Sequence, residues 1–208
     1  MRRHALIAAI AALVLVLGLG ALVALRQSPL EFDSEWMTDV LEDRSAWLTI
    51  PALFMDFIGG GWVAVFLVPL GGAALFLVAR KPWAALYFVL GSALSAGLVQ
   101  LLKTLFGRAR PETILIHVDA GSFPSGHVAN AATVAVMLGL IFRRTWVWVL
   151  GVAYVVLMAL SRTYLGAHWV SDTIGGALLG AAVAVLVWTC IPAMHRDPDR
   201  DSSTAATA

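Results

Sequence analysis

Residues 161–172, SRTYLGAHWVSD, form a short polar break between two long apolar runs. Within this segment His168 and Asp172 are four residues apart, so they would share one face if the segment is helical. A carboxylate in that position can hold an imidazole in one tautomer and increase its basicity. The same residues also fit a helix cap with an incidental ion pair at a membrane surface. This segment alone leaves both interpretations open.

The composition is that of a membrane protein. Of the 208 residues, 60% are hydrophobic and only 13% are charged, and the mean hydropathy is +0.85. A soluble domain is typically about a quarter charged and about half apolar. The net charge of +1 is carried by basic residues in small groups at the ends of apolar segments, which gives no indication of nucleic-acid binding.

Six apolar runs are long enough, or nearly long enough, to cross a bilayer as helices, for which about twenty residues are needed. They are residues 5–25, 61–79, 83–102, 128–142, 146–160 and 174–191. The first run is longer than the roughly 7–15 residues of a signal-peptide core, so we expect it to be retained. The sequence thus predicts an all-α membrane protein in which residues 1–195 form one bundle of six transmembrane helices.

The basic residues predict the orientation, because cytoplasmic loops carry an excess of Lys and Arg. Six alternating spans bring the main basic groups to one side: Arg2-Arg3, Arg80-Lys81, Arg143-Arg144 and Arg196 with Arg200. Both termini are then cytoplasmic, and the protein is a multi-pass protein of the cell membrane. The tail, residues 196–208, has the composition of a disordered segment.

The first outer loop has apolar residues at helical spacing. We expect residues 34–58 to form helical segments lying in the outer interface, with Trp36 and Trp47 at headgroup depth. Asp33 or Ser34 would cap the first of these helices. A plain connecting loop is the alternative.

Four cations lie on the outer side, against the charge bias: Lys103, Arg108, Arg110 and Arg162. Positive charge kept there indicates a bound anion, whereas snorkelling to lipid headgroups would explain only one or two of them. Lys103 and Arg110 are seven residues apart and would share a helix face if the third span continued by two turns. Arg108 falls on another face, so we place it outside the anion site.

A second anion-binding element precedes the fourth span, in the sequence Phe123-Pro124-Ser125-Gly126-His127. Ser125 is a natural N-cap, and Gly126 allows the backbone to approach a ligand closely. Free backbone N–H groups and the helix dipole favour an anion at this point. His127 can donate or accept a proton there, although a lone histidine is more often structural.

A metal site is a competing interpretation of the same region. Its ligands would be His117, His127, His168 and Asp172. Three nearby cations, Lys103, Arg110 and Arg162, would repel a metal ion. We therefore expect no metal and no other cofactor.

The order of these elements resembles the motifs of the type 2 phosphatidic acid phosphatase (PAP2) superfamily of membrane lipid phosphatases. The matching residues are Lys103-x6-Arg110-Pro111, Pro124-Ser125-Gly126-His127 and Ser161-Arg162-x5-His168-x3-Asp172. Each motif is weak alone, but three in this order on one membrane face are specific.

The resemblance implies a metal-independent mechanism through a phosphohistidine. His168 would be the nucleophile, Asp172 would orient it, and His127 would protonate the leaving oxygen and then activate water. The phosphate-binding residues would be Lys103, Arg110, Ser125, Gly126 and Arg162.

The implied substrate is a lipid phosphate or diphosphate reached from the outer leaflet. Candidates are undecaprenyl diphosphate, phosphatidylglycerophosphate, phosphatidic acid and diacylglycerol diphosphate, and we favour broad specificity that includes the first. Transfer of the phosphoryl group to a lipid acceptor would use the same residues. A non-catalytic lipid or phosphate transporter fits less well, because the ionisable residues lie at the ends of the spans. The oligomeric state is not indicated.

Overall fold

The computed structural model describes residues 2–26, 28–118 and 121–191, and these residues contain helices and loops but no strand. The helices are α1 (Arg2–Arg26), α2 (Glu31–Glu42), α3 (Ala46–Gly59), the π-helical η1 (Val63–Leu67), α4 (Val68–Val78), α5 (Pro82–Phe106), α6 (Gly126–Phe142), α7 (Thr145–Tyr164) and α8 (Val170–Cys190). The predicted tail at 196–208 lies outside the described residues.

Each of the six apolar runs coincides with a helix, which confirms the all-α membrane class. Four helices, α1, α5, α7 and α8, are each long and apolar enough to cross a membrane. A fifth span arises if α3 and the η1–α4 helix, which are bent by 46° relative to each other, are counted together. The helix α6 is apolar but has only 17 residues.

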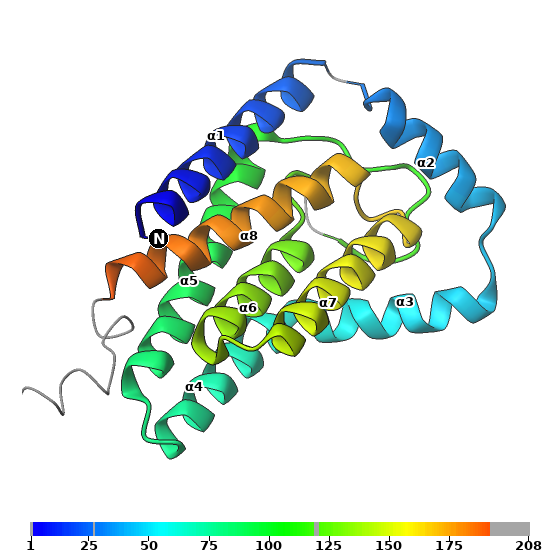
Figure 1. The fold of residues 1–208 in the computed structure, drawn as a ribbon. Coiled ribbons are helices and arrows are strands. Elements are labelled where there is room, and N and C mark those ends of the chain that lie inside the picture. Colours follow the sequence, from blue (N-terminus) through cyan, green and yellow to red (C-terminus); the bar gives the residue numbers. More distant parts are fainter. Residues whose placement is uncertain (1, 27, 119–120, 192–208) are drawn as a thin grey trace, which may run out of the picture.

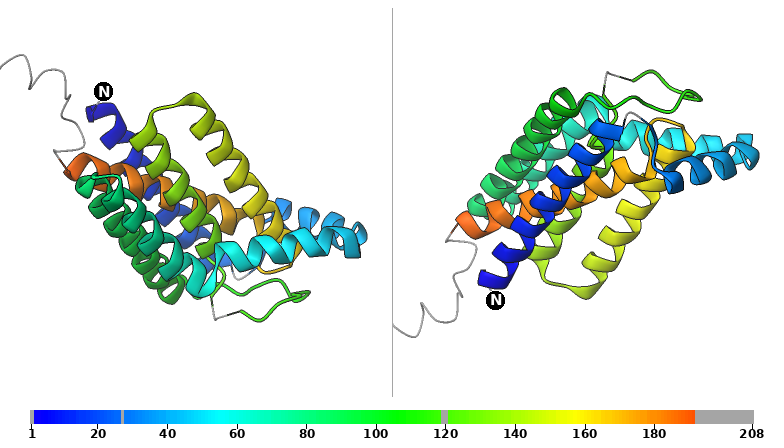
Figure 2. Two further views of the ribbon diagram at one scale, coloured as in Figure 1. Left: turned by 90° about the horizontal axis from the view of Figure 1, so that it is seen from below. Right: turned by 90° about the horizontal axis from the view of Figure 1, so that it is seen from above.

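The helices α1 and α4 to α8 form a bundle, with α2 and α3 at one end of it (Figure 1). The described parts of the loop before α6, residues 107–118 and 121–125, lie at that same end, as the two turned views show (Figure 2). The start of α1, the end of α8, and the turns that join α4 to α5 and α6 to α7 lie at the other end. The loops that carry the predicted site therefore meet at one end of the bundle.

The outer segment differs in detail from its prediction. The helix α2 begins at Glu31 after the N-cap residue Leu30, so Asp33 and Ser34 lie inside its first turn and neither is the cap. The segment expected to be helical from residue 34 to 58 is broken after Glu42, and α3 begins at Ala46. The helix α3 packs on α7, whereas α2 contacts α7 and α8.

Close packing of α6 against α8 forms the centre of the bundle. A Cβ atom at Gly180 would lie 2.1 Å from the carbonyl oxygen of Ala129, and one at Gly176 would lie 2.5 Å from that of Ser125. Small residues of this kind let transmembrane helices approach closely. Nearby, the Tyr87 hydroxyl donates a hydrogen bond to the Ala184 carbonyl over 2.8 Å, which satisfies a fully buried polar group.

The outer surface of the bundle is unusually apolar. Leu25 and Val78 are each 84% exposed, and many other leucine, valine, phenylalanine and tryptophan side chains also point outward. Soluble monomers seldom expose apolar patches on this scale. The surface is that of a protein surrounded by lipid.

We predict that Gly180→Ala destabilises the protein by about 1–3 kcal/mol, because the added methyl group overlaps backbone that cannot move away. Thermal unfolding in detergent micelles measures this effect as a lower midpoint. Gly18→Ala is the matched control, since a Cβ atom at Gly18 meets nothing within 4 Å. Equal midpoints for the two variants would contradict the proposed packing.

Candidate active site

The helix α5 ends earlier than the sequence predicted. It stops at Phe106, and Gly107 adopts a left-handed conformation with φ of 53°. Arg110 therefore lies in a loop, and the prediction that it shares a helix face with Lys103 is wrong. The two side chains converge by another route: Lys103 Nζ and Arg110 Nη2 each donate a hydrogen bond of 3.0 Å to the carbonyl oxygen of Gly121.

The start of α6 is placed as predicted, but its cap is different. Ser125 is the N-cap residue, yet its side chain makes no capping hydrogen bond. Its backbone N–H instead donates to the Asp172 carbonyl over 3.0 Å. The buried Ser125 hydroxyl has no hydrogen-bond partner among the described residues.

His127 and Arg162 meet at Asp56, a residue that none of the sequence motifs contains. The His127 Nε2 atom lies 3.1 Å from the backbone oxygen of Asp56 and 3.1 Å from its Oδ1 atom. Arg162, from the last turn of α7, is 1% exposed and forms an ion pair with the same carboxylate through Nη1. Within the described residues the buried Arg162 Nε atom has no partner. The one signal for Asp56 in the sequence is that it is the only ionisable residue in an otherwise apolar helix.

His168 lies in the loop before α8, and Asp172 in the first turn of that helix. They therefore share no helix face, and the predicted route to their contact is wrong. The contact itself exists: His168 Nδ1 lies 3.5 Å from Asp172 Oδ2. On the other side of the ring, His168 Nε2 lies 3.4 Å from Arg110 Nη1, which also donates to the Ala167 carbonyl over 2.6 Å.

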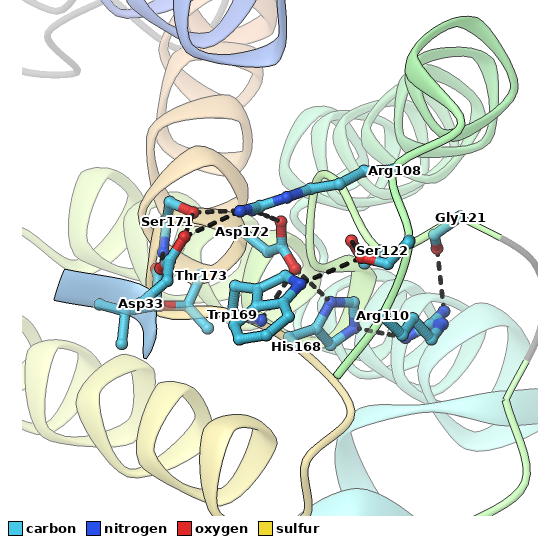
Figure 3. A network of polar contacts seen from close by, with 12 residues as sticks. Asp33, Arg108, Arg110, Gly121, Ser122, His168, Trp169, Ser171, Asp172 and Thr173 are labelled. Carbon is cyan, nitrogen blue, oxygen red and sulfur yellow. Dashed lines mark hydrogen bonds and ion pairs between the residues drawn. The ribbon is translucent and has the colours of Figure 1, made fainter. Parts of the chain in front are cut away.

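A buried polar network holds Asp172 in place (Figure 3). Its Oδ1 atom accepts a hydrogen bond of 2.5 Å from Arg108 Nη1, and its Oδ2 atom accepts one of 2.9 Å from the backbone N–H of Trp169. Arg108 Nη2 pairs at 2.8 Å with Asp33, whose two carboxylate oxygens also accept hydrogen bonds from Ser171. Arg108 thus neutralises two buried carboxylates instead of facing an anion, and Asp33 supports this network instead of capping α2.

These elements surround a cavity of about 910 Å³. Of the predicted site residues, Lys103, Arg110, Gly126, His127, Arg162 and His168 line it. Ser125 and Asp172 lie behind this lining. His117, considered above only as a ligand of the competing metal site, also lines the cavity. The structure therefore gathers cations, two imidazoles and a helix N-terminus around one space, which suits a tetrahedral anion.

The same cavity has an apolar part. It extends between the η1–α4 helix and α5, away from the polar end. Its volume is within the range of about 300–1,000 Å³ that is usual for small-molecule sites. The apolar lining includes Val63, Phe66, Pro69, Leu70, Val89 and Ala93.

The PAP2 superfamily matches residues 84–196, which is more than half of the chain. Phosphatidylglycerophosphatase B of Bacillus subtilis (strain 168) is 31% identical over 154 residues, or 69% of this chain and 75% of that protein. The undecaprenyl-diphosphatase of Sulfolobus acidocaldarius is 45% identical over 65 residues, which is 31% of each chain.

A solved structure agrees with these matches. The transmembrane PAP2 type phosphatidylglycerolphosphate phosphatase from Bacillus subtilis superposes with a TM-score of 0.73 at 26% identity. The superposition covers 86% of this chain and 93% of that one. The chain therefore belongs to the PAP2 superfamily, and it is an enzyme of the PAP2 lipid phosphatase type.

The electrostatics of His168 keep it neutral. Burial lowers the pKa of His168 to about 3; the Asp172 carboxylate opposes this shift, and Arg162 and Arg110 reinforce it. A neutral imidazole has a ring nitrogen with a lone pair, which a nucleophile requires. The ring is therefore in its nucleophilic form at neutral pH.

This pKa shift predicts that His168 lowers the stability of the folded protein at acidic pH. The unfolded chain binds a proton at His168 below pH 6.5, and the folded chain does not until about pH 3. Stability due to this group is therefore complete above pH 6.5 and falls as the pH decreases, by about 2 kcal/mol at about pH 5. We expect His168→Gln to lose less thermal stability than the wild type between about pH 7.5 and about pH 5. An equal loss in both proteins would show that His168 titrates normally.

Proposed function

We propose that the enzyme hydrolyses a phosphomonoester or diphosphate of a membrane lipid through a phosphohistidine intermediate. The observation that carries this proposal is the single cavity with a polar end and an apolar part. At the polar end, several cations and two histidines can contact a phosphate group. The apolar part, between the η1–α4 helix and α5, offers room for a lipid tail.

In the first step His168 attacks phosphorus. With Asp172 near Nδ1, the hydrogen of the neutral ring is on that atom and the lone pair is on Nε2, next to Arg110. A bond forms between Nε2 and phosphorus while the bond from phosphorus to the ester oxygen breaks. The leaving oxygen takes a proton from His127.

In the second step water attacks the phosphohistidine. His127, now neutral, takes a proton from the water as the new oxygen–phosphorus bond forms and the nitrogen–phosphorus bond breaks. Inorganic phosphate leaves, and His168 and His127 return to their starting forms. In-line displacement requires the two histidines to lie on opposite sides of the phosphorus.

The phosphoryl oxygens carry the charge that must be stabilised in both steps. The support for this role is the Arg162 Nε atom and the Ser125 hydroxyl, two buried polar groups that make no hydrogen bond to any described residue. The backbone at Gly126 adds the N-terminus of α6. Lys103 and Arg110, which also line the cavity, add positive charge. With these groups in place, we propose a reaction that needs no metal or cofactor.

We propose a broad substrate range that includes undecaprenyl diphosphate, phosphatidylglycerophosphate, phosphatidic acid and diacylglycerol diphosphate. The names of the relatives support the first two. The site recognises the phosphate through charge, while the apolar part of the cavity discriminates little between tails. Transfer of the phosphoryl group from His168 to a lipid acceptor instead of water is the alternative, and product analysis with and without an acceptor separates the two.

The proposed reaction predicts a loss of at least about 10³-fold in phosphate release for His168→Ala, because no other group can take the nucleophile's place. Release is measured in detergent from the four lipids named above, with EDTA present throughout. His4→Ala, on the exposed surface of α1, is the control and keeps the wild-type rate. Unchanged release by His168→Ala refutes the nucleophile, and abolition by EDTA refutes the metal-free reaction.

We further propose that residues 1–195 form one six-span domain with both termini in the cytoplasm and the active site at the outer face of the cell membrane. The distribution of basic residues supports this arrangement, since Arg80 and Arg143 lie in turns at the end of the bundle opposite the cavity. In this arrangement the 17-residue apolar helix α6 is the sixth span.

Reporter fusions test this topology. We expect fluorescent-protein fusions after Arg80 and after Arg144 to fluoresce, because these turns face the cytoplasm. Alkaline phosphatase fusions after Ser45 and after Leu115 should be active, because these loops face outward. The reverse pattern would place the active site on the cytoplasmic side.

A further inference from the structure

The helix α3 brings one carboxylate into the active-site cavity. Asp56 is its only ionisable residue and lies at the start of its last turn, before Gly59 and Gly60. Its side chain is 29% exposed, and it lines the cavity together with the two histidines. None of the three sequence motifs contains it, and it lies outside the matched region of residues 84–196.

Asp56 makes two contacts with the same ring nitrogen. The His127 Nε2 atom is 3.1 Å from the Asp56 carboxylate and 3.1 Å from the Asp56 carbonyl oxygen. Both of these oxygens accept hydrogen bonds, so Nε2 carries a hydrogen. The ring also packs against the end of α3, since a Cβ atom at Gly60 would lie only 2.1 Å from Nε2. The end of α3 thus fixes both the position and the protonation of this nitrogen.

The surroundings of His127 otherwise disfavour a positive charge. Arg162 contacts Asp56 as well, and Lys103, Arg110 and His168 line the same cavity. Burial adds a further cost to charging the ring. Among the described residues that line the cavity, Asp56 is the only carboxylate. It is therefore the group that offsets these effects.

We propose that Asp56 is a positioning residue for the leaving-group step, which holds His127 in place and favours its protonated form. This inference rests on the proposed function. The proton passes from Nδ1 of the His127 imidazolium to the leaving oxygen and is replaced from the attacking water, while Nε2 keeps its hydrogen and Asp56 stays ionised throughout. Each catalytic histidine then has its own carboxylate: Asp172 for His168 and Asp56 for His127.

A matched pair of substrates isolates this step. Phosphatidic acid and diacylglycerol diphosphate have the same diacylglycerol tail but different leaving groups. Phosphatidic acid expels an alcohol, whose oxygen must be protonated as it leaves. Diacylglycerol diphosphate expels phosphatidate, a phosphate monoester. This leaving group is stable as an anion because its second pKa is about 6. A group that acts only through the proton donor affects the first substrate far more than the second.

The experiment compares kcat for the wild type and Asp56→Asn on these two lipids in detergent. We expect a decrease of about 100-fold for phosphatidic acid, the usual size of a general-acid contribution, and less than about fivefold for diacylglycerol diphosphate. The variant should then convert diacylglycerol diphosphate to phosphatidic acid and accumulate it. The control is Asp39→Asn, an exposed position on α2, which should match the wild type on both lipids.

Asp56→Glu is the second variant, and it decides the question if Asp56→Asn does not fold. It keeps the charge but moves it by one methylene group, so the loss should be smaller than for Asp56→Asn and again confined to phosphatidic acid. An equal loss on both lipids would show that Asp56 only anchors α3, and no loss on either would show that it has no role.

One further outcome overturns the proposal. If Asp56→Asn keeps its kcat and inorganic phosphate inhibits it more strongly than it inhibits the wild type, Asp56 competes with phosphate for Arg162 instead of serving His127. Failure of the proposed function is seen separately, because the wild type would then release phosphate from neither lipid.

Discussion

The buried carboxylate of Asp172 holds the candidate active site together. It is fully buried, and a charge there is stable only when it is paired and hydrogen-bonded. Arg108 supplies the opposite charge, and the Trp169 N–H supplies a further hydrogen bond. Each partner comes from a different part of the chain, so satisfying this charge requires the loop after α5 and the start of α8 to adopt one relative position.

Further contacts join the neighbouring helices to Asp172 and Arg108. Arg108 also pairs with Asp33, which ties α2 to the start of α8 through Ser171. The backbone of Asp172 accepts a hydrogen bond from Ser125 and so ties α8 to α6. His168 lies next to this network, which fixes the orientation of its imidazole ring. The loops that fold around the buried Arg108–Asp172 ion pair therefore set the position of the His168 ring.

The second carboxylate, Asp56, has a different setting. It is partly exposed, lies on the wall of the cavity itself and reaches two groups far away in the sequence, His127 and Arg162. The cavity therefore has one rigid side, built around Asp172, and one side formed by α3, which is joined to the rest of the bundle by the glycines at 59–61 and a bend of 46°. The apolar part of the cavity begins at this bend.

Local properties of the sequence determined the class of protein, the positions of the long helices and the residues of the three motifs. Apolar runs of sufficient length form helices in lipid because their backbone groups have no other partners, and this depends on composition alone. Predictions that extended a helix by spacing were wrong for Lys103 with Arg110 and for His168 with Asp172. A left-handed residue at Gly107 ends α5, and α8 begins only after His168, so both pairs meet across loops.

Only the tertiary structure decided the partners of the charged groups. Asp56 and Arg162 are separated by 106 positions, and Asp33 and Ser171 by 138, so no local pattern relates them. Burial in a medium of low dielectric constant makes an unpaired charge costly, and folding selects whichever opposite charge can reach it. The sequence by itself thus specified the helices and the motif residues. The packing of the helices decided which charged groups meet: Arg108 with Asp172 and Asp33, and Asp56 with His127 and Arg162.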